Sequence, residues 1–466
     1  MISFLTRVVN IYHDREYFRL LIKFAFPIAV QSLITASLNL VGVVMIGQLG
    51  DTSIAAVSLA NQIWFLLNLL MFGIVSGCAM FVAQLWGKKD VHNVRRVLGM
   101  AIKLGLLAAL IFWILGIFFP GAVLHLYTED PAVIKLGSQY LRIFSWSYGF
   151  YAISTAYGIS LRSTGYVRLP LIVSTAALGL NILIAYPLIF GWNAIGISAL
   201  GVSGAAIAGL IARILECLAM LVVVYWDQQN PSAAPFRDLL DLDFEFMASV
   251  LKPVLPVIAN EFLWSMGMTA YSAIYAHIST SAIAAINIIS TIDQLAFVTF
   301  LGIGSATAIL VGNLIGQGEY KKAYLYGGRS LGLQISGASM MGLLVYLFAG
   351  QLLHFFKVTP EVIADARNIL IVLSLGYPVR SANHVIILGI LRSGGDTRFS
   401  LVLDGMIIWL IGVPITAAGA FLFHFPIQFV YALTLSEEVT KFIVGLRRYF
   451  SRKWINDLTQ KVAPVS

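Results

Sequence analysis

Apolar residues form long runs along the chain, separated by short segments that hold most of the charged residues. Runs of about 20–25 apolar residues are long enough to cross a bilayer as helices. Six such runs lie in the first half of the chain, near 21–46, 54–84, 98–119, 133–161, 169–190 and 200–226. Six more lie in the second half, near 253–276, 286–315, 325–350, 366–391, 399–421 and 427–446. The pattern predicts an all-α polytopic membrane protein with twelve transmembrane helices.

Composition agrees with this prediction. Apolar residues make up 59% of the 466 residues and charged residues 11%, against about 45–50% and 25% in ordinary soluble proteins. The two cysteines, Cys78 and Cys217, both lie inside apolar runs, so a disulfide framework is not expected.

Basic residues are distributed unequally between the segments that connect the spans. Seven segments carry 21 Lys and Arg residues, namely 1–23, 85–97, 162–168, 227–252, 316–324, 392–398 and 447–466. The six segments that alternate with them carry one, Lys357. Because basic loops stay in the cytoplasm, both termini are expected there, in a protein of the cell membrane. The net charge of +8 is then a topology signal, and nucleic acid is not an expected partner.

The two halves of the sequence repeat one another. A shift of 229 residues places Pro27 on Pro256, T-S-I-A-A-V (52–57) on S-A-I-A-A-I (281–286) and Gly87 on Gly316. An even number of helices in each half makes the repeats parallel, so two six-helix lobes related by a pseudo-twofold axis along the membrane normal are expected. The predicted division is an N-lobe (1–226), a cytoplasmic linker (227–252), a C-lobe (253–446) and a basic cytoplasmic tail (447–466).

Four short motifs carry a resemblance to a known family. They are G-V-V-M-I-G-Q-L-G (42–50), A-Q-L-W-G-K-K-D (83–90), V-G-N-L-I-G-Q-G (311–318) and L-R-S-G-G-D-T-R-F (391–399). In their order, spacing and duplication the sequence resembles multidrug and toxic compound extrusion (MATE) transporters, from about residue 19 to 454. The resemblance implies two lobes that move by alternating access. It also implies export of organic, often cationic compounds in exchange for sodium or protons.

Ionisable residues inside the spans are the main functional candidates, because such a group at the bilayer centre costs at least ~2.5 kcal/mol. Glu261 is the strongest, since it follows the helix-kinking Pro256. Trp264, Met268 and Tyr271 come after it at helical spacings. Aromatic rings beside a carboxylate suit an amphipathic cation. Glu261 could also hold sodium, or pair with Arg380 to stabilise the C-lobe.

Other polar residues within the spans divide into candidates and structural groups. Asp293, Asp404 and Arg380 are further candidates for cation coupling or substrate binding, and Gln31, Asn39 and Asn181 for the substrate cavity. Arg213 and Glu216 are expected to form an intrahelical pair. Glu437, Glu438 and Lys441 are expected to reach towards the membrane surface. Arg162 and Arg392 are expected to neutralise helix ends or lipid phosphates.

Three positions depart from the family pattern. Gly42, Ala185 and Ser381 stand where branches of the family carry aspartate. A cation-coupling site in the N-lobe is therefore not expected, and Glu261 in the C-lobe is the predicted coupling residue. The sequence leaves open whether sodium or a proton is the coupling ion. No other cofactor or metal is expected.

Two alternative functions remain at this level. The first is a flippase for lipid-linked glycans or other lipids, built on the same two-lobed design, although few cationic residues are available in the N-lobe spans for a pyrophosphate group. The second is a membrane-embedded enzyme, but the seven histidines show no H-E-x-x-H spacing. The expected partners are a small organic substrate and the bilayer, with the chain acting as a monomer.

Overall fold

The computed structural model describes residues 14–192, 196, 198–354, 356 and 358–461. The described chain forms two compact units. Unit 1 contains the described residues of 1–29, 83–89 and 251–466, and unit 2 contains 30–82 and 90–250. Lys357, in one of the connecting segments, lies outside the described residues.

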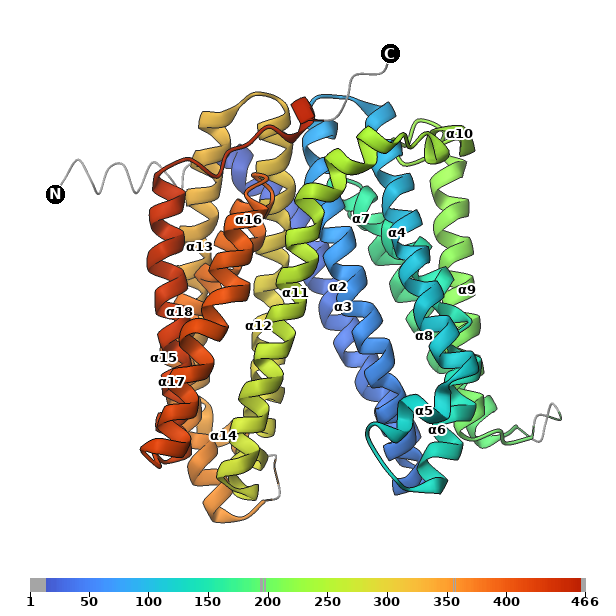
Figure 1. Ribbon diagram of the computed structural model, residues 1–466, viewed down its shortest axis with the longest axis vertical. Coiled ribbons are helices and arrows are strands. Elements are labelled where there is room, and N and C mark those ends of the chain that lie inside the picture. Colours follow the sequence, from blue (N-terminus) through green and yellow to red (C-terminus); the bar gives the residue numbers. More distant parts are fainter. Residues whose placement is uncertain (1–13, 193–195, 197, 355, 357, 462–466) are drawn as a thin grey trace. The chain divides into compact units, whose positions relative to one another are not determined.

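The first half of the chain supplies the elements from α2 to α10 (Figure 1). They are α2 (Arg15–Gly47), α3 (Asp51–Gly87), α4 (Val91–Phe118), α5 (Pro120–His125), α6 (Pro131–Phe144), α7 (Ser147–Ser163), α8 (Arg168–Phe190), α9 (Val202–Trp226) and α10 (Phe236–Leu240). Within unit 2, α9 packs against α6, α7 and α8. Gly204 of α9 lies so close to the backbone of Leu188 in α8 that no Cβ atom would fit between them.

The second half supplies the elements from α11 to α18. They are α11 (Phe244–Ile278), α12 (Thr280–Gly316), α13 (Tyr320–Leu347), α14 (Ala349–Leu353), α15 (Pro360–His384), η2 (Val385–Arg392), α16 (Thr397–Ser400), η3 (Leu401–Met406), η4 (Ile408–Gly412), α17 (Val413–Ala417), η5 (Ala418–Leu422), α18 (Ile427–Phe450) and the short 3₁₀ turn η6 (Leu458–Lys461). Within unit 1, α15 packs against α12, α13 and α18 around an apolar core that includes the fully buried Ile369, Leu370 and Val430.

The prediction of twelve spans in an all-α protein is confirmed, because each predicted span falls on a helix or on consecutive helices. Among the described residues, ten helices are long and apolar enough to cross a membrane. The other two predicted spans do not meet this criterion, for two different reasons. The fourth is divided into α6 and α7 at Ser145 and Trp146, so that each piece is too short to cross a membrane by itself. The twelfth, α18, carries several charged residues.

The N-terminal part of α2 and the C-terminal end of α3 belong to unit 1. Gly316 at the end of α12 approaches the carbonyl of Gln84 in α3, and a Cβ at Gly316 would overlap it. The buried Gln84 side chain donates to the Ser393 carbonyl at 2.8 Å and accepts from the Leu458 backbone at 2.7 Å. The predicted basic tail therefore contacts α3 through Leu458, and its Trp454 is fully buried.

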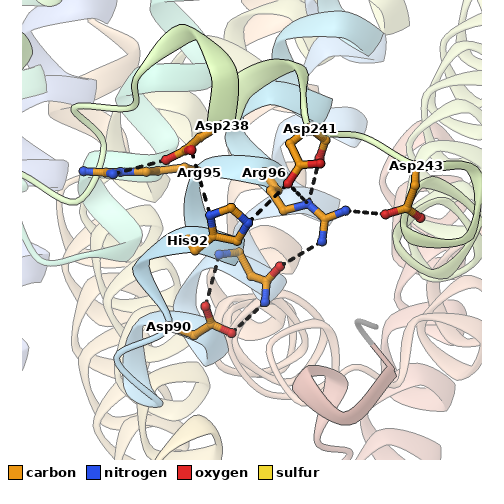
Figure 2. A network of polar contacts seen from close by, with 8 residues as sticks. Asp90, His92, Arg95, Arg96, Asp238, Asp241 and Asp243 are labelled. Atoms are coloured by element: carbon orange, nitrogen blue, oxygen red, sulfur yellow. Dashed lines mark hydrogen bonds and ion pairs between the residues drawn. The ribbon is translucent and has the colours of Figure 1, made fainter. Parts of the chain in front are cut away.

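The predicted linker is held against α4 by opposite charges (Figure 2). His92, Arg95 and Arg96 on α4 face three aspartates that flank or lie on α10. Arg96 pairs with Asp243 at 2.5 Å and Arg95 with Asp238 at 3.2 Å. The Phe246 backbone N–H, together with Arg96, keeps the pKa of Asp243 below its ordinary value of 3.8. Residues 244–252 of this segment already form the first turns of α11.

Candidate polar network and N-half cavity

A buried polar network in unit 1 is centred on Lys441 of α18. Its ammonium lies 3.1 Å from Asp404 Oδ1 and 3.6 Å from Glu437 Oε1, and its side chain is 2% exposed. The expectation that this lysine reaches towards the membrane surface was therefore wrong. A charge that is held this deep needs partners close by, and two carboxylates supply them.

Each of the two carboxylates beside Lys441 is also hydrogen-bonded to a residue of α11. Asn260 donates from Nδ2 to Asp404 at 2.9 Å, while its own Oδ1 atom is buried and has no partner among the described residues. Tyr271 donates its hydroxyl proton to Glu437 at 2.9 Å. Gly412 makes this contact possible, because a Cβ there would overlap both the hydroxyl and the carboxylate.

Glu261, the predicted coupling residue, lies next to Asn260 on α11 and is buried. Its Oε1 atom is 2.5 Å from Nη2 of Arg392. The prediction that Glu261 could pair with Arg380 was therefore wrong. Arg392 is 3% exposed, so the lipid-phosphate alternative expected for it was wrong. It ends η2, a π-helical stretch that continues α15, and such stretches are frequent at functional sites.

Arg380 instead pairs with Asp293, another predicted site residue. The distance from Arg380 Nη1 to Asp293 Oδ2 is 2.9 Å, and Tyr377 donates to Asp293 Oδ1 at 3.0 Å. The sequence therefore selected three carboxylates, Glu261, Asp293 and Asp404, each of which proves to have a different cationic partner.

The polar contacts of unit 1 contain more carboxylates than cations. A further carboxylate, that of Glu438, accepts a hydrogen bond from the neutral side chain of Asn383 at 2.6 Å. The interacting groups then comprise five carboxylates and three cations, namely Glu261, Asp293, Asp404, Glu437 and Glu438 with Arg380, Arg392 and Lys441. An excess of two negative charges inside a low-dielectric protein attracts cations, including protons. Among the described residues, no group of three or more His, Cys, Asp or Glu side chains is placed to hold a metal ion.

Unit 2 contains a cavity of about 460 Å³ between α2, α3, α6, α8 and α9. Asn39 and Asn181, both predicted for the substrate cavity, line it, as do Gly42 and Ala185. Two of the three positions without the family aspartate thus line one space. Its charged lining consists, within the described residues, of Arg213 and Glu216. These two form the predicted intrahelical pair at 2.7 Å.

The other residues predicted for the substrate cavity do not line this space. Gln31 is buried and accepts a hydrogen bond from Arg162 at 2.9 Å, so Arg162 also has a protein partner rather than a lipid phosphate. Trp264 and Met268 are exposed, 38% and 41%, whereas Tyr271 is buried against Glu437. Helical spacing places these three residues on one stripe of α11, and of the three Tyr271 is the buried one.

A family model described as MatE matches residues 27–187 and 256–418, one match in each half. The chain belongs to the MatE family. It is 24% identical over 435 residues to the uncharacterized transporter YisQ of Bacillus subtilis, covering 93% of this chain and 94% of that protein. It is 27% identical to the probable multidrug resistance protein YoeA of the same organism, over 84% of both chains. The probable multidrug resistance protein NorM of Bacillus cereus is 25% identical, over 84% of this chain and 86% of that protein.

Solved structures share the same fold. The Vibrio cholerae MATE transporter VcmN, in its bent form, superposes with a TM-score of 0.84 at 18% identity, over 96% of this chain and 98% of that chain. A MOP superfamily transporter from Pyrococcus furiosus gives 0.83 at 18% identity, over 96% of both chains. As a member of the MatE family, this chain is a multi-pass membrane transporter and not an enzyme.

Proposed function

We propose that this MatE-family chain is a multidrug efflux antiporter of the cell membrane, acting as a monomer with both termini in the cytoplasm. It exports organic, cationic compounds in exchange for an inward-moving cation. The names of the relatives YoeA and NorM support drug efflux, and the one-sided distribution of basic segments supports the orientation. The observation that carries the antiport proposal is the excess of carboxylates in the polar network of unit 1.

The coupling ion enters this network at Glu261 or Asp404. The contacts favour a proton over sodium, because each carboxylate already faces a cationic side chain that would repel a metal ion. A proton instead bonds directly to the carboxylate and removes the attraction to Arg392 or Lys441. The unpartnered Oδ1 of Asn260, whose Nδ2 donates to Asp404, is available to accept a hydrogen bond from a protonated Asp404.

This exchange of partners provides a switch between two states. While Glu261 is ionised, its pair with Arg392 joins α11 to η2. Protonation breaks that pair and frees the two helices to separate, and release of the proton on the other side restores it. One elementary charge moving down 100 mV supplies about 2.3 kcal/mol, which sustains a roughly 50-fold concentration ratio of an exported compound.

The test is dye transport in proteoliposomes, with sodium and proton gradients imposed separately. The proton gradient should drive dye movement and the sodium gradient should not. Glu261→Gln should abolish the transport driven by the gradient at unchanged protein content, while Glu129→Gln, at an exposed loop position, should transport like the wild type. Transport by Glu261→Gln at the wild-type rate would remove this residue from the mechanism, and transport driven by sodium alone would exclude the proton.

A further inference from the structure

The cavity of unit 2 has a polarity that the proposed efflux of cations does not explain. Its two charged lining residues, Arg213 and Glu216, lie near the middle of α9. Glu216 is the less accessible of the two, with its side chain 8% exposed against 25% for Arg213. Both Glu216 oxygens already accept hydrogen bonds, Oε1 from Ser174 at 2.8 Å and Oε2 from Arg213 at 2.7 Å. The hydrogen-bonding groups of this pair that remain open to a ligand are therefore N–H donors of Arg213.

Arg213 is fixed in position and still has donors to offer. Its guanidinium carbon lies 5.3 Å from the ring centre of Trp64 and 5.1 Å from that of Tyr151. Of its five N–H groups, one makes a hydrogen bond within the described chain, to Glu216. A guanidinium that is held on aromatic rings, with N–H groups to spare, matches a carboxylate, which binds through two parallel hydrogen bonds.

The remaining walls suit an aromatic ligand. Trp64, Tyr140 and Phe144 line the cavity beside Arg213. Their rings are in contact, with Trp64 and Phe144 at 5.5 Å and Tyr140 and Phe144 stacked at 5.3 Å. The side chains of Asn39 and Asn181 add polar groups on α2 and α8. A volume of about 460 Å³ falls in the range of pockets that hold drug-sized molecules.

We propose that the cavity of unit 2 binds amphipathic aromatic compounds through their carboxylate, with Arg213 as the anion-binding residue and Glu216 as its positioning partner. This proposal rests on the efflux function and extends it, because the transported compounds then include aromatic carboxylates and zwitterions as well as cations. Gly42 and Ala185 contribute by leaving the cavity without a further carboxylate that would repel such a ligand.

The test measures binding of two probes by the purified full-length protein, 2-naphthoate and 2-naphthyltrimethylammonium, which share a ring system and differ in charge. Isothermal titration calorimetry should show naphthoate binding to the wild type. The double variant Arg213→Gln/Glu216→Gln, which leaves no buried charge unpaired, should bind naphthoate about 10- to 100-fold more weakly, as expected for loss of a charge-assisted hydrogen bond. Glu216→Gln alone should bind it several-fold more tightly.

Two further measurements keep the test decisive. Arg213→Lys retains the charge without the fork of donors, so it should show an intermediate loss even if the double variant fails to fold. The titration is repeated in nanodiscs of phosphatidylcholine with and without phosphatidylglycerol, where the naphthoate affinity should be the same. Competition by phosphatidylglycerol that disappears in the double variant would show that a lipid phosphate occupies the cavity, and would overturn the proposal.

Failure of this proposal is distinguishable from failure of the proposed function. Equal naphthoate affinity in the wild type, Arg213→Lys and the double variant would overturn the anion site, even if dye is still transported. A preference for the ammonium probe that is lost in Glu216→Gln would overturn it as well. Absence of gradient-driven dye transport, with naphthoate binding that still depends on Arg213, would refute the antiport function and support the site.

Discussion

Replacing Lys441 with methionine tests how the polar network of unit 1 is held together. Methionine keeps most of the length and apolar stem of lysine but removes the ammonium, which lies 3.1 Å from Asp404 and 3.6 Å from Glu437. Removing one member of a buried ion pair costs about 3–5 kcal/mol, because the remaining charge is left without a partner. For a unit of this size, such a loss lowers the melting temperature by roughly 6–20 °C.

The assay is thermal unfolding of the purified protein in detergent, followed by tryptophan fluorescence. Lys252→Met is the matched control, since Lys252 is an exposed residue of α11 and should change the midpoint little. The triple variant Lys441→Met/Asp404→Asn/Glu437→Gln should recover most of the loss, because no buried charge then lacks a partner. A Lys441→Met midpoint equal to that of the wild type would refute the reasoning, as would a triple variant that is no more stable than the single one.

Three other changes test separate features. Gly316→Ala would overlap the carbonyl of Gln84 and should cost about 1–3 kcal/mol in thermal unfolding, while Gly179→Ala, in open space, should cost nothing; equal effects would exclude the close helix contact. Gly412→Ala would separate the hydroxyl and carboxylate that meet beside it, and should reduce proton-driven dye transport at unchanged binding of dye; unchanged transport would remove this hydrogen bond from the mechanism. The pKa of Asp243 is below 3.8 in the folded protein, so its contribution to holding segment 227–243 against α4 is present above pH 3.8 and is lost as the pH falls through the lowered pKa. Protease cleavage of 227–243 should therefore rise at that low pH in the wild type. Asp243→Asn should be cleaved readily at all pH values.

The helices could be predicted from the sequence because apolar runs of bilayer length admit few other structures. The interruption after Phe144 could not, since the apolar pattern continues through Ser145 and Trp146, where α6 ends and α7 begins. The helical character of residues 244–252 was not predicted, because they adjoin the aspartate-rich segment that precedes them. Six of the nine are apolar, and they form the first turns of α11.

The candidate site was predictable to the extent that charge inside a span is rare. Glu261, Asp293 and Asp404 were selected on that ground alone, but their partners were not. Arg392 precedes a glycine-rich turn and was expected at the membrane surface, whereas the π-helical end of its helix places it beside Glu261. For Lys441 a sequence signal existed, because Glu437 precedes it by four residues, the spacing of a helical ion pair.

The sharing of α2 and α3 between the two units has a consequence for how the gene can be divided. The sequence repeat invites expression of each half as a separate polypeptide, cut within 227–243. The second half alone would lack residues 14–29 and 83–89, which belong to unit 1. The glycines at 302 and 316 would then expose the surfaces that receive the carbonyls of Ala25 and Gln84. Functional protein should therefore be recovered only when both fragments are produced in the same cell.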